Sequence, residues 1–557
     1  MHVFLLLFST VQKVMIQYYI ERQCVLKCTR HLLMLSYGSK ADSSVREMVL
    51  KLISDGLESR LLSVIESLLS ATYPESMEVD FFTLWAEEML IEDNLILDIL
   101  FIAYYESFCT CDGKQWKNLC LLYEVYFLSI FTAFFYLFYK ASNSRLFQCQ
   151  RMISGSCNFG KLAISTEAVK SIYHARVQLL LILIETLYLE NILQMVHDET
   201  PFRFNLLNLC LHFNSTWYFE IFRLQLCLYV YSVLKVHIEI HCSQGNISFA
   251  LSDIQEVDAI ISSLDPFETK EAGPLILAWA VFLCLISSLP EKPEYNLITE
   301  TDHVGYVRQA IRAASLNYFD EILHSNLLKD SEGPIASSRS VLRTFFSAFI
   351  ASYEISLQLE DNNLKLILNI LGEIYRGEES LCVQFWDRDS FIDGPIRCLL
   401  YNLEGEFPFR TVELISLLSA LSEGAWPAEC VYNFLDKSVG LSTLVELRGN
   451  FGVDNNSRII DTRLPLCVPG FEGLEIPRDT RGRVLKFIDD NTALVRWEYN
   501  QSGVLVLLLR VAQEMYPDGS EEVLVILDLI SRLVTFNKVN CMVVSLVLIF
   551  ICQNLDS

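Results

Sequence analysis

Apolar residues recur with helical spacing over most of the chain, and the pattern is clearest beyond residue 362. Six of them stand at positions i, i+3, i+4, i+7, i+10 and i+11, which predicts one amphipathic helix. They are Leu364, Ile367, Leu368, Leu371, Ile374 and Tyr375. Gly377 predicts the end of this helix, because glycine is favoured just beyond a helix terminus.

Further helices are expected at short intervals. Gly394-Pro395 predicts a helix start, since proline is tolerated in the first turn, and Gly405 predicts its end. A leucine stripe then predicts the next helix, which ends at Gly424: Leu414, Leu417, Leu418 and Leu421.

Two more segments repeat this arrangement. Pro427 is expected to begin a helix, and Asp253 to cap another that Asp265-Pro266 ends. The helix after Pro427 turns four residues inward: Cys430, Val431, Phe434 and Leu435. Helices of this length joined by short loops pack as antiparallel neighbours. The pattern predicts an all-α fold, an irregular HEAT/ARM-like α-solenoid without a recurrent repeat signature.

The period changes after a polar stretch at Gly449–Thr462. Apolar and polar residues then alternate along Arg483–Ile488 and Ala493–Tyr499, on either side of turn residues 489–491, which predicts a β-hairpin. Short strands are also expected at Leu474–Ile476 and Gly503–Val506. Several short strands in one segment are typical of a small SH3-like β-barrel.

These patterns divide the chain into three parts. Residues 1–464 are expected to form the α-solenoid, residues 465–503 the inserted SH3-like β-barrel, and residues 504–557 a helical continuation. The continuation carries its own apolar stripe: Val523, Leu527, Ile530 and Val534.

Composition and charge narrow the classes of function. Hydrophobic residues make up 52% of the 557 residues and charged residues 20%, so the chain can fill a continuous core and is not disordered. With 22 glycines and 14 prolines, it has few of the turn residues that all-β domains need. A net charge of −25 would repel nucleic-acid phosphates, so no direct nucleic-acid binding is expected.

The 17 cysteines are odd in number and scattered, and many lie in apolar helical stretches. Cys284, Cys398 and Cys430 are examples. This distribution indicates a reducing compartment and free thiols rather than a disulfide framework.

Three apolar stretches raise the question of a membrane. Val3–Phe8 lacks the cationic flank and the cleavage site of a secretory signal. Val125–Tyr139 and Val539–Gln553 are at or below the length that spans a bilayer. We therefore disfavour a secretory signal at Val3–Phe8, interpret the two longer stretches as buried helices, and expect no membrane span.

No catalytic, cofactor-binding or metal-binding residue is expected. Gly155–Leu162 nearly matches a phosphate-binding P-loop, but Leu162 cannot ligate Mg²⁺ as Ser or Thr would. His237 and His241 lie four residues apart beside Cys242, yet a zinc site needs three or four convergent ligands. Two other groups are too sparse to define a site: Cys109 with Cys111, and Asp387 with Asp389.

Two features of the expected barrel could serve binding. Trp497 and Tyr499 share one strand face, as the aromatic cages of methyl-lysine readers do, but Ala493 and Val495 share it too, so we interpret it as barrel core. The second feature is a cationic cluster that could contact an acidic partner: Arg478, Arg481, Arg483 and Lys486. It is offset by nearby acids: Glu472, Glu475 and Asp479.

Two long stretches resemble the large inner-ring scaffold nucleoporins, closest to the nucleoporin 188 family of the plant type. They are Phe385–Gly440, which begins FWDRDSFIDGPIRCLLYNLEGEFPFR, and Leu464–Tyr516, which includes TRGRVLKFIDDNTALVRWEYNQSGVLVLLLR. Shorter matches are Gln17–Leu33 and Val49–Arg60, and together they span most of residues 11–538. The resemblance implies the N-terminal portion of an irregular solenoid with an inserted SH3-like barrel.

The resemblance also implies a function. Members of this family are structural subunits of the nuclear pore complex at the nuclear envelope. They bind linker and scaffold nucleoporins and support nucleocytoplasmic transport of protein and mRNA. The resemblance implies no catalytic residue and no cofactor, and no partner-binding residue can be named from the pattern.

The chain departs from the family in several places. Family members begin earlier and run much further, so the chain is expected to be an N-terminal portion lacking both ends. The apolar block at 126–150 is atypical of the family, and residues 539–557 do not continue its helix pattern. Both segments resemble translated non-coding sequence.

Two other classes stay open beside the scaffold. A karyopherin-like adaptor would also be an acidic helical solenoid, but with regular repeats and without a barrel. A membrane-anchored helical adaptor would use Val539–Gln553 as its anchor.

Overall fold

The structure is a computed structural model of the chain. It describes residues 2–36, 43–69, 79–124, 166–199, 249–267, 270–288, 302–325, 335–353, 361–387, 390–437, 439–446, 451–454, 459–468, 471, 474–488, 492–499, 502–513 and 521–536. These residues are mostly helical, as expected, with a small β-structure between residues 441 and 497. The chain forms two compact units, residues 1–192 with 225–341 and residues 193–224 with 342–557.

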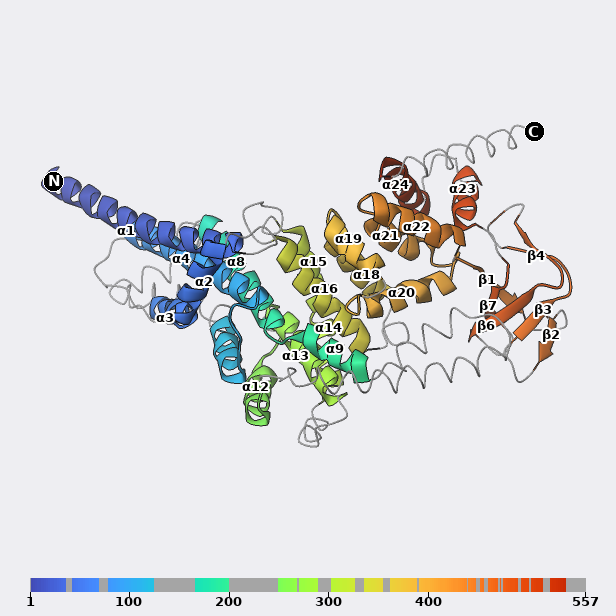
Figure 1. The fold of residues 1–557 in the computed structure, drawn as a ribbon, viewed down its shortest axis with the longest axis horizontal. Coiled ribbons are helices and arrows are strands. Elements are labelled where there is room, and N and C mark those ends of the chain that lie inside the picture. Colours follow the sequence, from blue (N-terminus) through green and yellow to red (C-terminus); the bar gives the residue numbers. More distant parts are fainter. Residues whose placement is uncertain are drawn as a thin grey trace, which may run out of the picture. The chain divides into compact units, whose positions relative to one another are not determined.

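The first unit is built from helices, and many of its packed pairs are close in sequence (Figure 1). Its helices are α1 (His2–Leu35), α2 (Ser43–Ser54), α3 (Leu57–Leu69), α4 (Val79–Tyr105), a segment at 113–124, α8 (Thr166–Glu185), α12 (Leu251–Ser263), α13 (Ala272–Ser287), α14 (His303–Arg312) and α15 (Ser315–His324). Two more helices cross its limits: α9 (Leu189–Glu199) and α16 (Ile335–Ser352). Helix α4 packs on both α1 and α8, and α13 packs on α14 and α15.

Helix α13 lies in the core of the first unit and is buried on nearly all sides. Trp279 of this helix stacks on Trp116 with ring centroids 5.3 Å apart, and its indole Nε1 donates to Asp258 at 3.0 Å. A Cβ on Gly273 would lie 2.2 Å from Ser315 Oγ, so glycine allows α15 to approach closely. Burial removes the apolar side chains of α13 from water, which explains why this helix lies inside the protein.

Buried carboxylates join α4 to α1. Arg30 Nη1 of α1 lies 3.0 Å from Asp98 Oδ2 of α4, and Arg22 pairs with Glu92. Glu92 and Asp98 are both buried. A buried charge is tolerated only when it is paired, so these arginines are required for the packing of the two helices.

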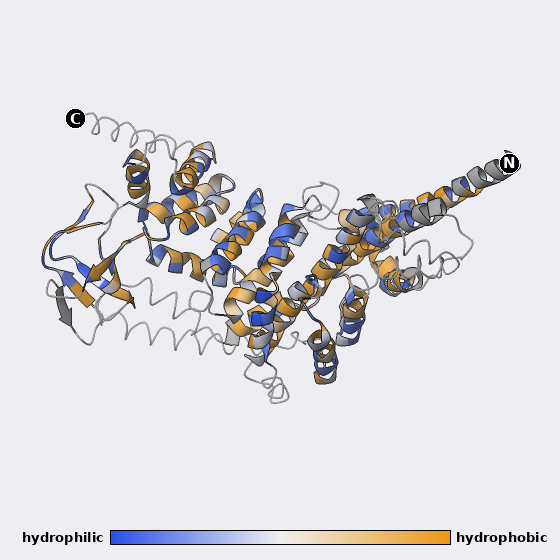
Figure 2. Ribbon diagram, turned by 180° about the vertical axis from the view of Figure 1, so that it is seen from behind, coloured by the Kyte–Doolittle hydropathy of each residue, from blue (hydrophilic) through white to orange (hydrophobic). Residues whose placement is uncertain are grey.

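The second unit contains the helices that the apolar stripes predict most clearly. They are α18 (Asp361–Tyr375), α19 (Glu379–Trp386), α20 (Gly394–Gly405), α21 (Thr411–Ala420), α22 (Ala425–Lys437), α23 (Gly503–Gln513) and α24 (Glu521–Phe536). Gly377 (φ +78°) follows α18 and Gly424 (φ +102°) follows α21, conformations that favour glycine. The predicted stops at these two glycines and the predicted start at Gly394-Pro395 are confirmed. Figure 2 shows hydrophobic and hydrophilic residues on the described helices, the pattern expected of helices that are buried on one side.

Three details differ from the sequence-based expectation. Helix α12 begins at Leu251, so Asp253 lies in its first turn, where its side chain accepts from the backbone N–H of Ala250 at 3.3 Å. Asp253 supports this helix start without being its cap residue. In α24 the buried stripe is shifted, since Ile526 is buried and Leu527 is 45% exposed. The short helix α19 was not predicted.

Within the described residues, seven strands follow α22: β1 (Leu441–Glu446), β2 (Phe451–Asp454), β3 (Ile459–Thr462), β4 (Leu466–Cys467), β5 (Glu475–Ile476), β6 (Arg481–Phe487) and β7 (Thr492–Trp497). Five of them form an antiparallel sheet in the order β1-β7-β6-β3-β2, and β4 pairs with β5. One face of the sheet is buried, and its residues alternate with outward ones: Leu441, Thr443 and Val445 in β1, Gly482 and Val484 in β6, and Ala493, Val495 and Trp497 in β7.

The structure confirms part of the expected β-structure and corrects the rest. The hairpin of β6 and β7 and the strand at Leu474–Ile476 are present. The expected strand at Gly503–Val506 is wrong, because these residues begin α23. Strands β1 to β3 lie at 441–462, which the hydrophobic pattern assigns to the helical array, so the sheet begins before residue 465.

The sheet leaves and rejoins the helical part of its unit at adjacent points. A Cβ on Gly503, the first residue of α23, would lie 2.7 Å from the backbone oxygen of Leu435 in α22. The chain therefore comes back to α22 after the whole β-segment, and α22 packs on both α23 and α24. Figure 1 shows β1, β6 and β7 grouped beyond α20 and α22, with α23 and α24 beside α22.

Candidate functional site

Several residue groups weighed for chemistry lie outside the described residues. These are the P-loop-like segment Gly155–Leu162, the pair His237 and His241 with Cys242, and Asp389. Asp387 directly follows α19, and its backbone N–H closes the end of that helix. Within the described ranges, no group of three or more His, Cys, Asp or Glu side chains could hold a metal ion.

The pair Cys109 and Cys111 has the environment of core thiols. Both are buried, and burial raises the pKa of the Cys109 thiol to about 12 and that of the Cys111 thiol further, with Glu58 adding to both shifts. A thiol reacts through its thiolate, so a raised pKa makes it unreactive. The ten described cysteines are thiols outside any disulfide.

The aromatic pair of the sheet does not form a cage. Trp497 is 2% exposed, and its indole Nε1 donates to Thr443 Oγ1 at 2.7 Å. A Cβ on Gly482 would lie 2.5 Å from the Trp497 ring, so the neighbouring strand covers that ring. Tyr499 is half-buried. The interpretation of this face as core is confirmed for Trp497.

The sheet is docked on the end of α20 by a polar cluster that sequence reasoning did not find. Arg496 Nη2 of β7 lies 2.6 Å from Glu404 Oε1 of α20, and the same carboxylate oxygen accepts from the Gly440 backbone N–H at 2.9 Å. The Ser442 hydroxyl donates to the Gly405 carbonyl at 2.6 Å. Burial raises the pKa of Glu404, and Arg496 and the Gly440 N–H oppose that shift.

A second contact joins the small two-stranded region to the last helices. The Arg510 guanidinium of α23 lies 5.7 Å from the Phe471 ring centroid, which is a cation–π distance. Arg510 also pairs with Glu522 of α24 at 3.0 Å. The β-segment therefore contacts a helix before it through the five-stranded sheet and a helix after it through the residue between β4 and β5.

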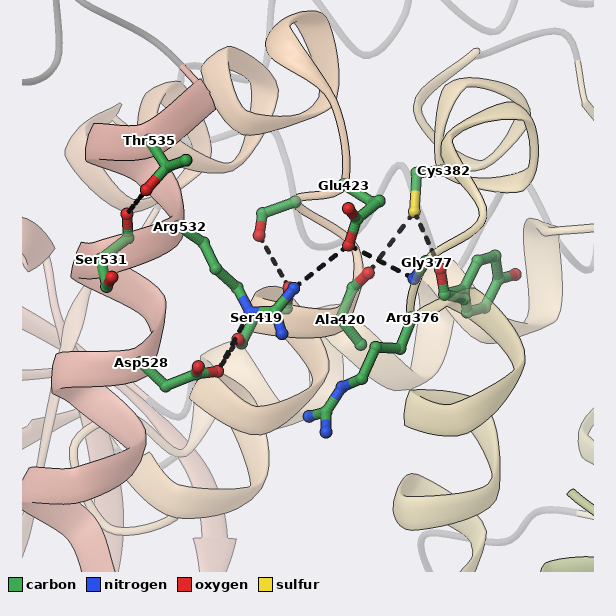
Figure 3. Close-up of polar contacts among 12 residues, drawn as sticks. Arg376, Gly377, Cys382, Ser419, Ala420, Glu423, Asp528, Ser531, Arg532 and Thr535 are labelled. Carbon is green, nitrogen blue, oxygen red and sulfur yellow. Dashed lines mark hydrogen bonds and ion pairs between the residues drawn. The ribbon is translucent and has the colours of Figure 1, made fainter. Parts of the chain in front are cut away.

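The helical part of the second unit is held together across the inserted sheet (Figure 3). Arg532 of α24 pairs with Glu423 at 3.1 Å, and Ser419 of α21 donates to Asp528 of α24 at 2.5 Å. Glu423 also accepts from the Gly377 backbone N–H at 3.3 Å. These partners are 109 residues apart in sequence, so α24 continues the packing of α21 after the sheet. We call α18 to α24 the helical body.

The cationic cluster lies on the exposed side of the sheet. The side chains of Arg478 and Arg481 are 67% and 62% exposed, and Arg483 and Lys486 are exposed as well. Of the acids expected to offset them, Asp479 lies 3.6 Å from Arg478. A further acid, Asp461 of β3, lies with its Oδ1 3.8 Å from Arg481 Nε.

The apolar stretches Val125–Tyr139 and Val539–Gln553 lie outside the described residues, whereas Val3–Phe8 is part of α1. In the described part of the chain, one helical stretch is long and apolar enough to cross a membrane, Lys170–Val196. Of the most apolar window of that stretch, 61% is buried inside the protein, as in the core helix of a soluble protein. Length and composition alone do not distinguish the two cases.

Comparison with known proteins finds the same nucleoporin from two organisms. The chain is 24% identical to nucleoporin NUP188 of Homo sapiens over 252 residues, and equally to nucleoporin NUP188 of Mus musculus. The chain is similar to NUP188. The expected resemblance to the nucleoporin 188 family is thereby confirmed.

The similarity to NUP188 covers 44% of this chain but 13% of either relative. The chain thus spans a small part of the length of the curated NUP188 proteins that it matches. No protein-family model matches the chain.

Proposed function

We propose that this chain is a structural scaffold subunit of the nuclear pore complex inner ring, at the nuclear envelope. Similarity to NUP188 over 252 residues carries this proposal. The described residues are mostly helical, and the chain carries a net charge of −25, both of which suit a helical scaffold. In this role the chain performs no catalysis, needs no cofactor, and supports nucleocytoplasmic transport of protein and mRNA.

We also propose a finer architecture for the chain. The helices form an irregular HEAT/ARM-like solenoid, and strands β1 to β7 form an SH3-like barrel inserted between α22 and α23. Support comes from a five-stranded antiparallel sheet with one buried face and from the adjacent positions of Leu435 and Gly503. A module with its own core that leaves and rejoins its host at one place is the usual form of a domain insertion.

The partners that suit such a protein are other nucleoporins, both linker and scaffold subunits. A helical array has a large surface for its mass and can bind extended peptides in the grooves between helices. The net charge of −25 disfavours direct contact with nucleic acid. We expect no membrane span in this role.

Tagging the endogenous protein tests the proposal. We expect a signal concentrated at the nuclear rim and pore scaffold subunits in the affinity eluate. A diffuse cytosolic signal with soluble transport cargo in the eluate would favour a karyopherin-like adaptor. Retention in the endoplasmic reticulum without pore subunits would favour a membrane-anchored adaptor. Either of these results would refute the scaffold role.

A further inference from the structure

The outward face of β6 carries a row of positive side chains. Arg481 and Arg483 are exposed, whereas Gly482 and Val484 between and after them are buried. A bulge between Val484 and Lys486 then restores Lys486 to the same side, because Lys486 pairs with Leu494, two residues from the partner of Arg483. We call Arg481, Arg483 and Lys486 the cationic strip.

The strand register explains why the cationic strip is tolerated. Arg483 lies directly opposite Arg496 of β7, and like charges in that position destabilise a sheet. The negative charge of Glu404 in α20 compensates that of Arg496, because Glu404 Oε1 lies 2.6 Å from Arg496 Nη2. The end of α20 thus neutralises Arg496 of β7, whereas the side chains of the cationic strip on β6 are exposed to water.

The cationic strip differs from the arginines that hold the helices of its unit together. Arg343 is 4% exposed and lies 3.5 Å from Asp393, and Arg532 is 23% exposed and pairs with Glu423. Arg481, by contrast, is 62% exposed and lies 3.8 Å from an Asp461 that is itself 58% exposed. An ion pair in such a setting contributes little to stability, so folding does not account for this side chain.

Exposed apolar side chains lie next to the cationic strip. Leu444 of β1 is 41% exposed and pairs with Leu494 of β7, which in turn pairs with Lys486. Leu494 itself is 6% exposed, so Leu444 and Lys486 share this face on either side of a buried position. Ile488, directly after β6, is 56% exposed. The surface therefore combines charge with adjacent apolar area, a combination suited to protein recognition.

We propose that the cationic strip, with Leu444 beside it, is a docking surface for an extended acidic peptide of another protein. Residues two apart on a strand repeat every ~7 Å, and alternate residues of an extended peptide have the same spacing. A peptide with a carboxylate at every second residue can therefore meet Arg481 and Arg483 together. This proposal does not depend on the proposed role in the nuclear pore, because peptide binding is measured with the purified chain alone.

Charge decides between an acidic peptide and a nucleic acid as the occupant. A nucleic acid presents continuous phosphates, which would meet Asp461 beside the strip and the field of a chain with net charge −25. A peptide can place single carboxylates on the strip and uncharged residues elsewhere. The acidic peptide is thus the occupant that the charges favour.

Fluorescence anisotropy with the purified full chain tests this surface. The probe is a labelled peptide that alternates glutamate and threonine, and the matched probe replaces glutamate by glutamine. We expect the glutamate probe to bind at least about tenfold more tightly than the glutamine probe, and salt to weaken it. Labelled oligouridylate and vesicles of phosphatidylserine with phosphatidylcholine are the competing ligands.

Variants assign the binding to the strip. R481E/R483E/K486E should weaken the glutamate probe about tenfold or more, and R481Q/R483Q/K486Q should weaken it less, with circular dichroism confirming the fold of each. The control K365E/R376E/K437E reverses three exposed cations of the helical body and should change affinity by less than about twofold. Unchanged binding by both strip variants, or tighter strip-dependent binding of oligouridylate or vesicles, would overturn the proposal.

Discussion

Among the arginine–glutamate pairs of the second unit, one joins the sheet to α20 and another lies inside the helical body. The pair Arg496–Glu404 measures 2.6 Å, and the Glu404 side chain is 4% exposed. The pair Arg532–Glu423 measures 3.1 Å, and the Glu423 side chain is 22% exposed. The two pairs have the same chemistry but differ in how far water reaches the carboxylate.

This difference suggests how each region is attached. A carboxylate removed from water depends on its partners, because an unpaired buried charge costs several kcal/mol. A carboxylate at the rim can exchange its partner for water at little cost. The sheet is therefore docked through a contact that must be kept whole. The helical body combines its pair with apolar packing of α21 on α24, where Leu418 and Leu529 are buried.

The largest effect should come from deleting part of the sheet. Removal of residues 465–503 takes away β6 and β7 but leaves β1, whose Leu441 and Val445 are buried by pairing with β7. It also leaves Glu404 without Arg496 and removes Gly503 from α23. We expect loss of cooperative helical melting by circular dichroism and a tendency to aggregate.

A deletion with structure-based limits should behave differently. Replacing residues 440–502 by a short glycine–serine linker keeps Gly503 beside Leu435 and exposes the end of α20 to water. The helices should then melt cooperatively with a small loss of stability. If both deletions still melt cooperatively, the helical body is independent of the sheet. If neither does, the body requires the sheet, and either result contradicts the expected difference between the two deletions.

Trp497→Ala should have the next largest effect, and it should be confined to the sheet. The indole is 2% exposed and bonded to Thr443, so its removal leaves a cavity and an unpaired hydroxyl at a cost of ~4 kcal/mol. Hydrogen–deuterium exchange should accelerate in β1, β6 and β7 and stay nearly unchanged in α21 and α24. Equal acceleration in the body would mean that the two regions unfold as one.

The two ion pairs can be compared directly by removing one arginine at a time. Arg496→Ala leaves Glu404 buried without its cation and should cost the sheet ~3 kcal/mol. Arg532→Ala leaves a carboxylate that water can reach and should cost the body ~1 kcal/mol or less. Urea unfolding followed by exchange in each region measures both. An equal loss of unfolding free energy in the two variants would contradict the claim that a more deeply buried carboxylate depends more on its arginine.

The helices could be predicted from the sequence because their ends carry strong local signals. Gly377, Gly424 and Gly394-Pro395 mark helix ends whatever the surroundings, and the two strands of the hairpin alternate clearly. Strand β1 was missed because the polar Thr443 lies on its buried face and the apolar Leu444, 41% exposed, lies on its outward face, which breaks the alternation in the sequence. The segment from Gly503 is a short apolar run, and such runs fit strand and helix equally well.

The polar contacts could not be predicted at all. Glu404 and Arg496 are 92 residues apart, and neither has a local sequence feature that distinguishes it from a surface residue. Their pairing depends on where the sheet meets α20, which is a property of the tertiary structure. The similarity to NUP188 was recognised from Phe385–Gly440 and Leu464–Tyr516, yet it gave no indication of this contact.

The smallest effect should be on the pH dependence of the stability of the sheet, to which Glu404 contributes. Burial raises the pKa of Glu404 above its ordinary value of 4.5, so the folded state binds this proton more tightly than the unfolded chain. The stabilising contribution is then complete below pH 4.5 and is lost as the pH rises through the folded pKa. Glu404→Gln cannot titrate but still accepts from Gly440 and Arg496, so it should flatten this slope. Thermal melting at a series of pH values, wild type against Glu404→Gln, measures the difference. A wild-type sheet that gains stability from Glu404 as the pH rises would show that Arg496 outweighs burial at this contact.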